Sequence, residues 1–99
     1  MIVWLKEAGN EAVRKQYIDA SKRLGKLPGV VTYRIGRVMP GKGEGSTGVA
    51  DNSFDIAVTS TFENQQALAA YLQSEEHRRI IDEELRPIVK KCIVYDFAE

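Results

Sequence analysis

Four segments of the chain are predicted to be β-strands, the first because it is a short run rich in strand-forming residues and the others because their side chains alternate between two faces. The segments predicted as strands are Ile2–Leu5, Val30–Met39, Phe54–Phe62 and Lys91–Phe97. In the third strand, one face carries Phe54, Ile56, Val58, Ser60 and Phe62, and the other face carries Asp55, Ala57, Thr59 and Thr61. Neither face of the second strand is wholly polar, so the sheet is predicted to be covered on both sides.

Two further segments have the three- and four-residue spacing of helices. Asn10 is the predicted N-cap of the first, whose apolar stripe is formed by Val13, Tyr17, Ala20 and Leu24. Asn64 is the predicted N-cap of the second, which carries Ala67, Leu68, Tyr71 and Leu72. Ser74 followed by two glutamates is typical of a new N-cap, so this helix is predicted to break there and to restart. The restarted helix carries His77, Ile80, Ile81 and Leu85, and Pro87 is expected to kink or end it.

The resulting order β-α-β-β-α-β predicts one ferredoxin-like α+β domain over residues 1–99. Its sheet is antiparallel with four strands, and both helices lie on one face. The other face is bare in a monomer although it carries apolar residues, and a second copy of the chain is the simplest cover. The segment Pro40–Ser53 has four glycines and little apolar material, so it is predicted to be a loop.

Composition limits the classes of partner. The chain has 99 residues with 14 Lys and Arg against 14 Asp and Glu, which gives a formal net charge of zero. This balance argues against a general binder of nucleic acid or of anionic membranes, because both need a surplus of basic residues. The charge is nevertheless polarised, with nine basic and four acidic residues in 1–50 and five and ten in 51–99. The two halves are therefore either attracted to each other, within one chain or across a symmetric dimer, or simply two solvated faces.

The chain has one cysteine and one histidine, Cys92 and His77, so neither an internal disulfide nor a zinc site of Cys and His ligands is expected. No metal is predicted.

No apolar run approaches the roughly 20 residues that span a bilayer. Trp4-Leu5 is followed at once by Lys6-Glu7, which is unlike a secretory signal, so a cytoplasmic location is expected. Cys92 is predicted to be a buried small hydrophobe on the last strand.

Residues 53–97 contain the motifs Phe54-Asp55-Ile56, Phe62-Glu63-Asn64, Ala70-Tyr71, Ser74-Glu75-Glu76-His77, Leu85-Arg86-Pro87 and Val94-Tyr95-Asp96-Phe97. In their order and spacing they resemble the strand, helix and final-strand motifs of the stress-responsive A/B barrel domain family. The turn Leu27-Pro28-Gly29-Val30 matches the family's turn before the second strand. In the family's histidine-proline step, the first His is replaced here by Ser74 and the Pro by Glu75.

The resemblance implies a homodimer whose sheets pack face to face into an α+β barrel, with an apolar pocket between sheet and helices in each subunit. Some plant relatives are polyketide cyclases, and the wider superfamily includes monooxygenases; neither group needs a cofactor, and none is predicted here. In the cyclases, a Tyr and a His at the positions of Tyr71 and His77 act together as acid and base. The hypothesis is that this pair lines a pocket with Val3, Leu5, Ile56, Val58, Ile80 and Ile81.

Three functions stay open at this point. The first is binding of a small apolar or aromatic molecule by the homodimer. The second is cofactor-independent enzyme chemistry, in which the His77 imidazole takes a proton from activated carbon and the Tyr71 phenol stabilises the enolate oxygen. The third is a structural dimer without a ligand, in which Tyr71 is a core aromatic and His77, near the start of its helix, serves only the fold.

Overall fold

Seven main elements form the fold in a computed structural model that describes residues 1–39 and 52–98. In chain order they are β1 (Ile2–Leu5), α1 (Glu11–Lys22), β2 (Val30–Arg37), β3 (Ile56–Phe62), α2 (Gln65–Gln73), α3 (Glu75–Ile80) and β4 (Val89–Ile93). A 3₁₀ turn η1 (Leu24–Lys26) follows α1, and a π-helical turn η2 (Ile81–Leu85) and a 3₁₀ turn η3 (Arg86–Ile88) lead from α3 into β4. Most of the predicted loop Pro40–Ser53 lies outside the described residues.

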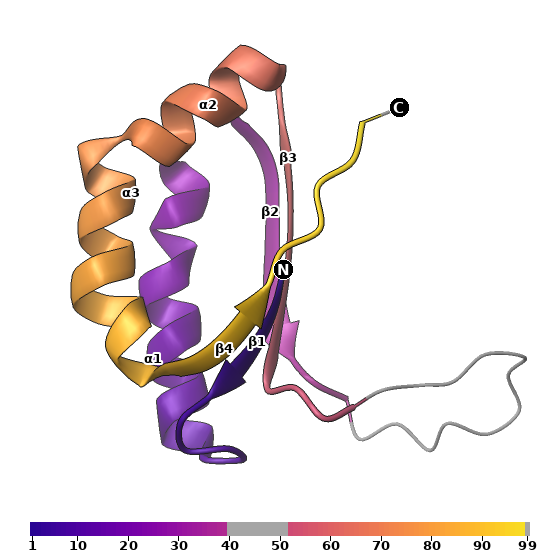
Figure 1. The fold of residues 1–99 in the computed structure, drawn as a ribbon, viewed down its shortest axis with the longest axis vertical. Helices are drawn as coiled ribbons and strands as arrows, with labels where there is room; N and C mark the ends of the chain where they lie inside the picture. Colours follow the sequence, from indigo (N-terminus) through magenta and orange to yellow (C-terminus); the bar gives the residue numbers. More distant parts are fainter. Residues whose placement is uncertain (40–51, 99) are drawn as a thin grey trace, which may run out of the picture.

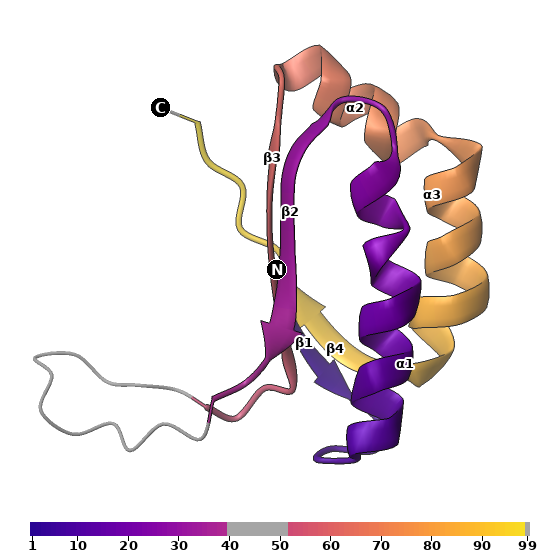
Figure 2. The ribbon, with the colours of Figure 1, turned by 180° about the vertical axis from the view of Figure 1, so that it is seen from behind.

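The four strands form one antiparallel sheet in the order β2-β3-β1-β4. Figures 1 and 2 show α1, α2 and α3 together on one side of this sheet. The predicted ferredoxin-like α+β fold is therefore confirmed. The predicted break in the second helix is also present, because α2 ends at Gln73 and α3 begins at Glu75.

Asparagine caps begin the two main helices where the sequence predicts them. The Asn10 Oδ1 accepts hydrogen bonds from the backbone N–H groups of Ala12 and Val13, at 3.0 and 3.2 Å. The Asn64 Oδ1 accepts one from Ala67 N–H at 2.7 Å. These bonds satisfy N–H groups that have no partner within the helix.

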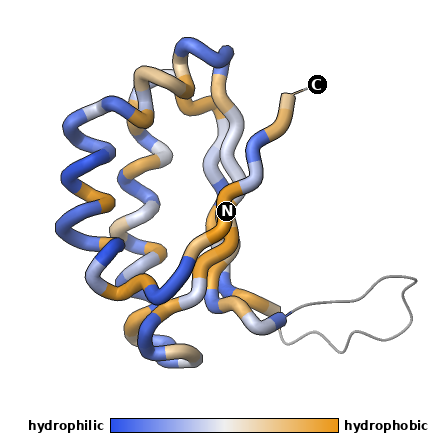
Figure 3. Tube along the Cα trace, in the orientation of Figure 1, coloured by the Kyte–Doolittle hydropathy of each residue, from blue (hydrophilic) through white to orange (hydrophobic). Residues whose placement is uncertain are grey.

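The core lies between the sheet and the helices. Its buried hydrophobic residues are Val3, Leu5, Ile56 and Val58 from the sheet, and Tyr17, Ile18, Ala20, Leu24, Tyr71, Ile80 and Leu85 from the helical layer. Burial of each large aliphatic side chain contributes about 1.5–3 kcal/mol. Figure 3 shows hydrophilic residues over much of α3, on the side of the molecule away from the sheet.

The last strand lies earlier in the chain than predicted. The sequence predicts Lys91–Phe97, whereas β4 is Val89–Ile93. The strand starts early because the 3₁₀ turn at Pro87 is followed by an extended backbone at Val89. It ends early because its last paired residue, Ile93, lies opposite Ile2, the first residue of β1. Cys92 is exposed, which corrects the prediction that it is buried, because β4 is the edge strand of the sheet.

The strands that flank the predicted loop are shorter than predicted, since β2 ends at Arg37 and β3 begins at Ile56. Asp55 therefore precedes the strand and does not follow its alternation. It is 2% exposed, and its carboxylate accepts hydrogen bonds from the backbone N–H groups of Leu5 and Gly9 at 3.0 and 2.9 Å. The prediction that Asp55 belongs to the third strand and shares a face with Ala57 is thus wrong.

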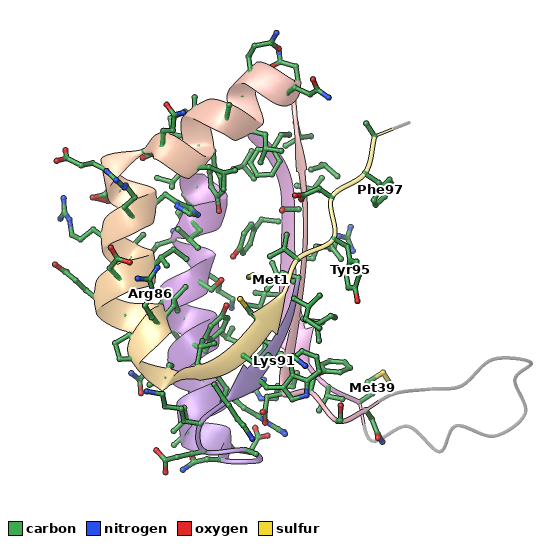
Figure 4. All side chains as sticks on the ribbon, viewed as in Figure 1. Met1, Met39, Arg86, Lys91, Tyr95 and Phe97 are labelled. Atoms are coloured by element: carbon green, nitrogen blue, oxygen red, sulfur yellow. The ribbon has the colours of Figure 1, made fainter. Side chains whose placement is uncertain are left out.

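The sheet face opposite the helices has no cover in the described chain. Val3 and Leu5 point into the core, so Ile2 and Trp4 alternate onto this open face. The Lys91 ammonium lies over the Trp4 ring, 4.9 Å from its centroid. Figure 4 shows Tyr95 and Phe97 on the segment after β4, on the side of the sheet away from the helices; they are 72% and 90% exposed.

Candidate functional site

The helix break at Ser74 brings Tyr71 and His77 together. On one continuous helix, residues six apart are rotated by about 240° around the helix axis, so their side chains would point about 120° apart. Ser74 instead has an extended backbone with φ −62° and ψ 136°, and its Oγ accepts a hydrogen bond from His77 N–H at 3.5 Å. As a result the two rings meet edge to face, with centroids 4.6 Å apart and planes at 61°.

Tyr71 lies in the core and is held from two sides. Its side chain is 7% exposed, and the Phe62 ring of β3 contacts it at a centroid distance of 4.8 Å. Burial raises the pKa of the Tyr71 phenol, and the nearby Tyr33 phenol raises it further. The phenol therefore stays protonated at neutral pH and is able to donate a hydrogen bond.

His77 is half-buried, and its Nδ1 atom is fully buried. Among the described residues, this nitrogen has no hydrogen-bond partner. Burial lowers the pKa of the imidazole, although the carboxylate of Asp82 opposes the shift. At neutral pH the ring is accordingly neutral, and one of its nitrogens carries a lone pair that can accept a proton or a hydrogen bond.

The six apolar residues of the predicted pocket lie in or beside the core. Val3, Leu5, Ile56, Val58 and Ile80 are at most 5% exposed, and Ile81 is partly buried against them. Two surface hollows have volumes of about 390 and 340 Å³. Both are lined mainly by charged residues of the helical layer, and neither includes Tyr71, His77 or any of the six. An apolar pocket between sheet and helices therefore stays a prediction.

Sequence reasoning missed the other hydroxyl groups on the inner side of the helices. Tyr17 of α1 is 2% exposed, and Ser21, one turn later, is 0% exposed. The Ser21 hydroxyl is hydrogen-bonded to the Tyr33 hydroxyl of β2. The available signal was the four-residue spacing of Tyr17 and Ser21, which places a serine on the face that was assigned to the apolar stripe.

Neither a metal centre nor a membrane span is found in the part of the chain that the structure describes. Its histidine, cysteine and acidic residues form no group of three or more that could hold a metal ion. Its helices are also too short and too polar to cross a membrane.

The strand order and the one-sided helical layer define a ferredoxin-like α+β domain. The family model for the stress-responsive A/B barrel domain matches residues 1–99, so the chain belongs to this family. No protein of curated function matches the chain.

Solved structures share the fold at low sequence identity. A protein of the same family from Mesorhizobium loti, described as having a ferredoxin-like fold, aligns with a TM-score of 0.68 at 22% identity, over 91% of this chain and 82% of that one. A dimeric ferredoxin-like protein of unknown function from Thermobifida fusca aligns with a TM-score of 0.64 at 19% identity, over 91% of this chain and 77% of that one. At these identities the likeness shows the fold alone.

Proposed function

We propose that this protein is a homodimer that binds a small apolar or aromatic molecule between sheet and helices, with Tyr71 and His77 at the polar end of the site. The observation that carries the proposal is the buried Nδ1 of His77, which has no hydrogen-bond partner in the described residues. Buried polar atoms almost always have a partner, and a ligand is one means of supplying it.

The surrounding side chains favour a ligand that is largely apolar. Phe62 and Tyr71 present aromatic rings, and aliphatic core residues lie around them. Pockets of this kind hold a ligand by apolar contact and orient it by a few polar groups. His77 and Tyr71 are suited to that orienting role because burial keeps both of them neutral.

The open sheet face supports the dimer. Trp4 and Ile2 lie on it, and Phe97 is 90% exposed beside it, which is costly for a chain that remains alone in water. A second copy in a two-fold arrangement covers the same patch on both subunits at once. The dimeric relative from Thermobifida fusca has the same fold, which agrees with this arrangement.

A second candidate is a cofactor-independent enzyme of the polyketide-cyclase or monooxygenase type. The specific observation in its favour is the 4.6 Å contact between the two rings, one bearing a free nitrogen and the other a protonated phenol. In such a reaction, His77 removes a proton from carbon next to a carbonyl group. Tyr71 then donates a hydrogen bond to the enolate oxygen that forms.

The test is a ¹H–¹⁵N NMR titration with phenolic, polyketide-like and aliphatic compounds. We expect shifts at Tyr71, His77, Ile56 and Val58, and about tenfold weaker binding in Tyr71→Phe, because one hydrogen bond to the ligand is lost. Tyr95→Phe is the matched control, since this tyrosine is exposed on the terminal segment. His77→Ala abolishes turnover if the residue is a base and only weakens binding if it lines the site.

The same titration tests the structural dimer. The near-complete burial of Val3, Leu5 and Ile56 is what a filled core without a ligand would also show. If no compound changes the chemical shifts and the dimer is intact, the result would favour a structural dimer and contradict ligand binding.

A further inference from the structure

The residues that follow β4 have the sequence of a strand but no strand to pair with in the described chain. Residues 94–97, with the sequence Val-Tyr-Asp-Phe, continue the alternation of β4 and are rich in strand-forming side chains. Pairing nevertheless stops at Ile93, because this residue lies opposite the first residue of β1. Figures 1 and 2 show the segment leaving the sheet on the side away from the helices. The backbone of residues 94–97 is therefore free to pair with another chain.

The strand β2 has the opposite deficit, because it is an edge strand with an open outer side in the described chain. It has eight residues, more than any other strand, and it stands at one end of the order β2-β3-β1-β4. Its side chain Val31 is 59% exposed. A long edge strand carries a row of unpaired N–H and C=O groups and is a template for an added strand.

The unpaired charges of the two segments are complementary. Tyr33 is bonded to Ser21 of α1 and so faces the helices, which places the next residue, Arg34, on the open face of β2. The other arginine of β2, Arg37, is already paired with Glu11. Arg34 and Asp96 are both exposed, and neither belongs to an ion pair among the described residues.

The topology separates these segments within one chain and allows them to meet between two chains. β2 and β4 lie at opposite edges of the sheet, three strand spacings or about 14 Å apart, so a segment that continues β4 does not extend β2 of its own chain. A two-fold axis would place the terminal segment of each copy beside β2 of the other, and the same contact would form twice. β2 belongs to the basic first half of the chain and the segment to the acidic second half.

We propose that residues 94–97 form a strand only when they are added to the outer edge of β2 in a second copy of the chain, where Asp96 pairs with Arg34 of that copy. The inference rests on the proposed homodimer and deepens it, because it names the segment and the charge pair that join the two copies. Backbone hydrogen bonds of the added strand supply affinity, and the charge pair fixes its register. The same addition removes the exposed Tyr95 and Phe97 from water.

Charge reversal tests the pair in the full chain. Arg34→Glu and Asp96→Arg should each weaken the homodimer about tenfold, because each homodimer then has two like-charged contacts. A one-to-one mixture of the two variants should recover the wild-type affinity, since both contacts in the mixed dimer again join opposite charges. Sedimentation equilibrium near the wild-type Kd measures all three. Arg78→Glu, the same change on the exposed surface of α3, is the control and should leave the dimer unchanged.

Amide hydrogen exchange tests the added strand itself. Alternate amides of residues 94–97 should exchange about tenfold more slowly in the wild-type dimer than in monomeric Arg34→Glu, because strand pairing closes every second N–H group of an edge strand. Circular dichroism should show that both single variants keep the fold, since the two replaced side chains are exposed.

The outcomes separate this inference from the proposed homodimer. Single variants that dimerise as tightly as the wild type, or unprotected amides in residues 94–97 of an intact dimer, overturn the added strand and leave the homodimer standing. Loss of the dimer in both variants without recovery on mixing also overturns the pairing between copies, because a contact within one chain cannot be restored by a second chain. A wild type that is monomeric at every concentration overturns the homodimer and the added strand together.

Discussion

Asp55, which directly precedes β3, is hydrogen-bonded to the end of β1, to the turn that follows it and to α1. Its carboxylate accepts hydrogen bonds from Leu5 N–H, Gly9 N–H and the Arg14 guanidinium, the last with an Nε–Oδ1 distance of 3.0 Å. Burial alone would raise the pKa of Asp55, but these donors outweigh it and hold the pKa below its ordinary value. The Asp55 carboxylate is therefore ionised at neutral pH, and its charged form stabilises the fold.

The first prediction is that Asp55→Asn lowers the free energy of unfolding by about 3 kcal/mol, because it removes one partner of a buried ion pair. Urea denaturation at pH 7 measures this loss. Lys15→Gln, which breaks the exposed pair with Asp19, is the control and should change little. In the wild type, the stabilisation by Asp55 is present above its ordinary pKa and is lost as the pH falls through the lowered pKa.

The second prediction concerns the pH dependence contributed by His77. Burial lowers the pKa of this imidazole in the folded protein, so the unfolded chain binds the proton more tightly. The free energy of unfolding should therefore fall as the pH drops below about 6.5, the unfolded value, and this decline should level off below the folded pKa. Denaturation between pH 5 and 8, with ¹H NMR titration of the ring, measures both limits.

His77→Gln is the control for that experiment, because it removes the titrating group and keeps a polar side chain. The variant should lack the decline near pH 6. A His77 ring that titrates above its ordinary pKa in the folded protein would contradict the assigned environment.

At the residue scale, the sequence supports some assignments and not others. Tyr71 and His77 were identified as a pair only through a family resemblance, since their six-residue spacing places them apart on any straight helix. Asp55 was assigned to the wrong face because alternation holds only within a paired strand, and β3 begins one residue later. The partner of Tyr33 was not predictable, because strand alternation gives a face and not the residue across the gap.

The break between α2 and α3 is the element that creates the candidate site. Ser74 ends one helix and caps the next, and two first-turn glutamates favour the new start through the helix dipole. Its bond to His77 N–H also fixes the backbone of the residue whose ring contacts Tyr71.

The third prediction is that Ser74→Ala lowers the free energy of unfolding by about 0.5–1 kcal/mol, the usual effect of a lost N-cap. It should also weaken the ring contact, which NOEs between Tyr71 and His77 would report. Ser74→Asp is the matched variant, because its carboxylate can accept the same bond and should preserve both stability and NOEs. Equal NOEs in Ser74→Ala and the wild type would show that packing alone holds the rings together.

At the scale of elements, local chemistry was sufficient wherever a cap or a stripe marks a boundary. Asn10, Asn64 and Ser74 all begin helices as predicted. The last strand was misplaced because its end depends on where β1 begins, which is a property of the pairing and not of residues 89–97. Similarly, no local signal separates the π-helical turn of η2 from the α-helix before it.

The molecule as a whole has two unlike sides. The helical side is charged, with ion pairs such as Arg23 with Glu84 and Arg86 with Asp82. The open sheet side carries apolar and hydroxyl groups, including the Thr32 and Thr61 hydroxyls, which are 2.7 Å apart. The sequence already indicated this contrast, because apolar residues occupy both faces of the strands while only one layer of helices is available to cover them.

The fourth prediction tests whether a second copy covers the open face. Ala57 lies on this face in the central strand β3, paired with Ile2 of β1, so a charged side chain there would be desolvated at the centre of the interface. Ala57→Arg should convert the dimer to a monomer at micromolar concentration, as measured by sedimentation equilibrium. The substitution should not unfold the chain, because in a monomer the new side chain extends into water.

Ala69→Arg is the matched control for the dimer. It makes the same chemical change on the exposed surface of α2, which faces away from the proposed interface, so it should leave the mass of the dimer unchanged. Circular dichroism should show the same helix content in both variants.

A dimer that survives in Ala57→Arg would require another interface, and a wild type that is monomeric at every concentration would contradict the proposed dimer. The exposed Phe97 and Tyr95 would then be left without the partner that explains their exposure, which is why this measurement decides the assembly.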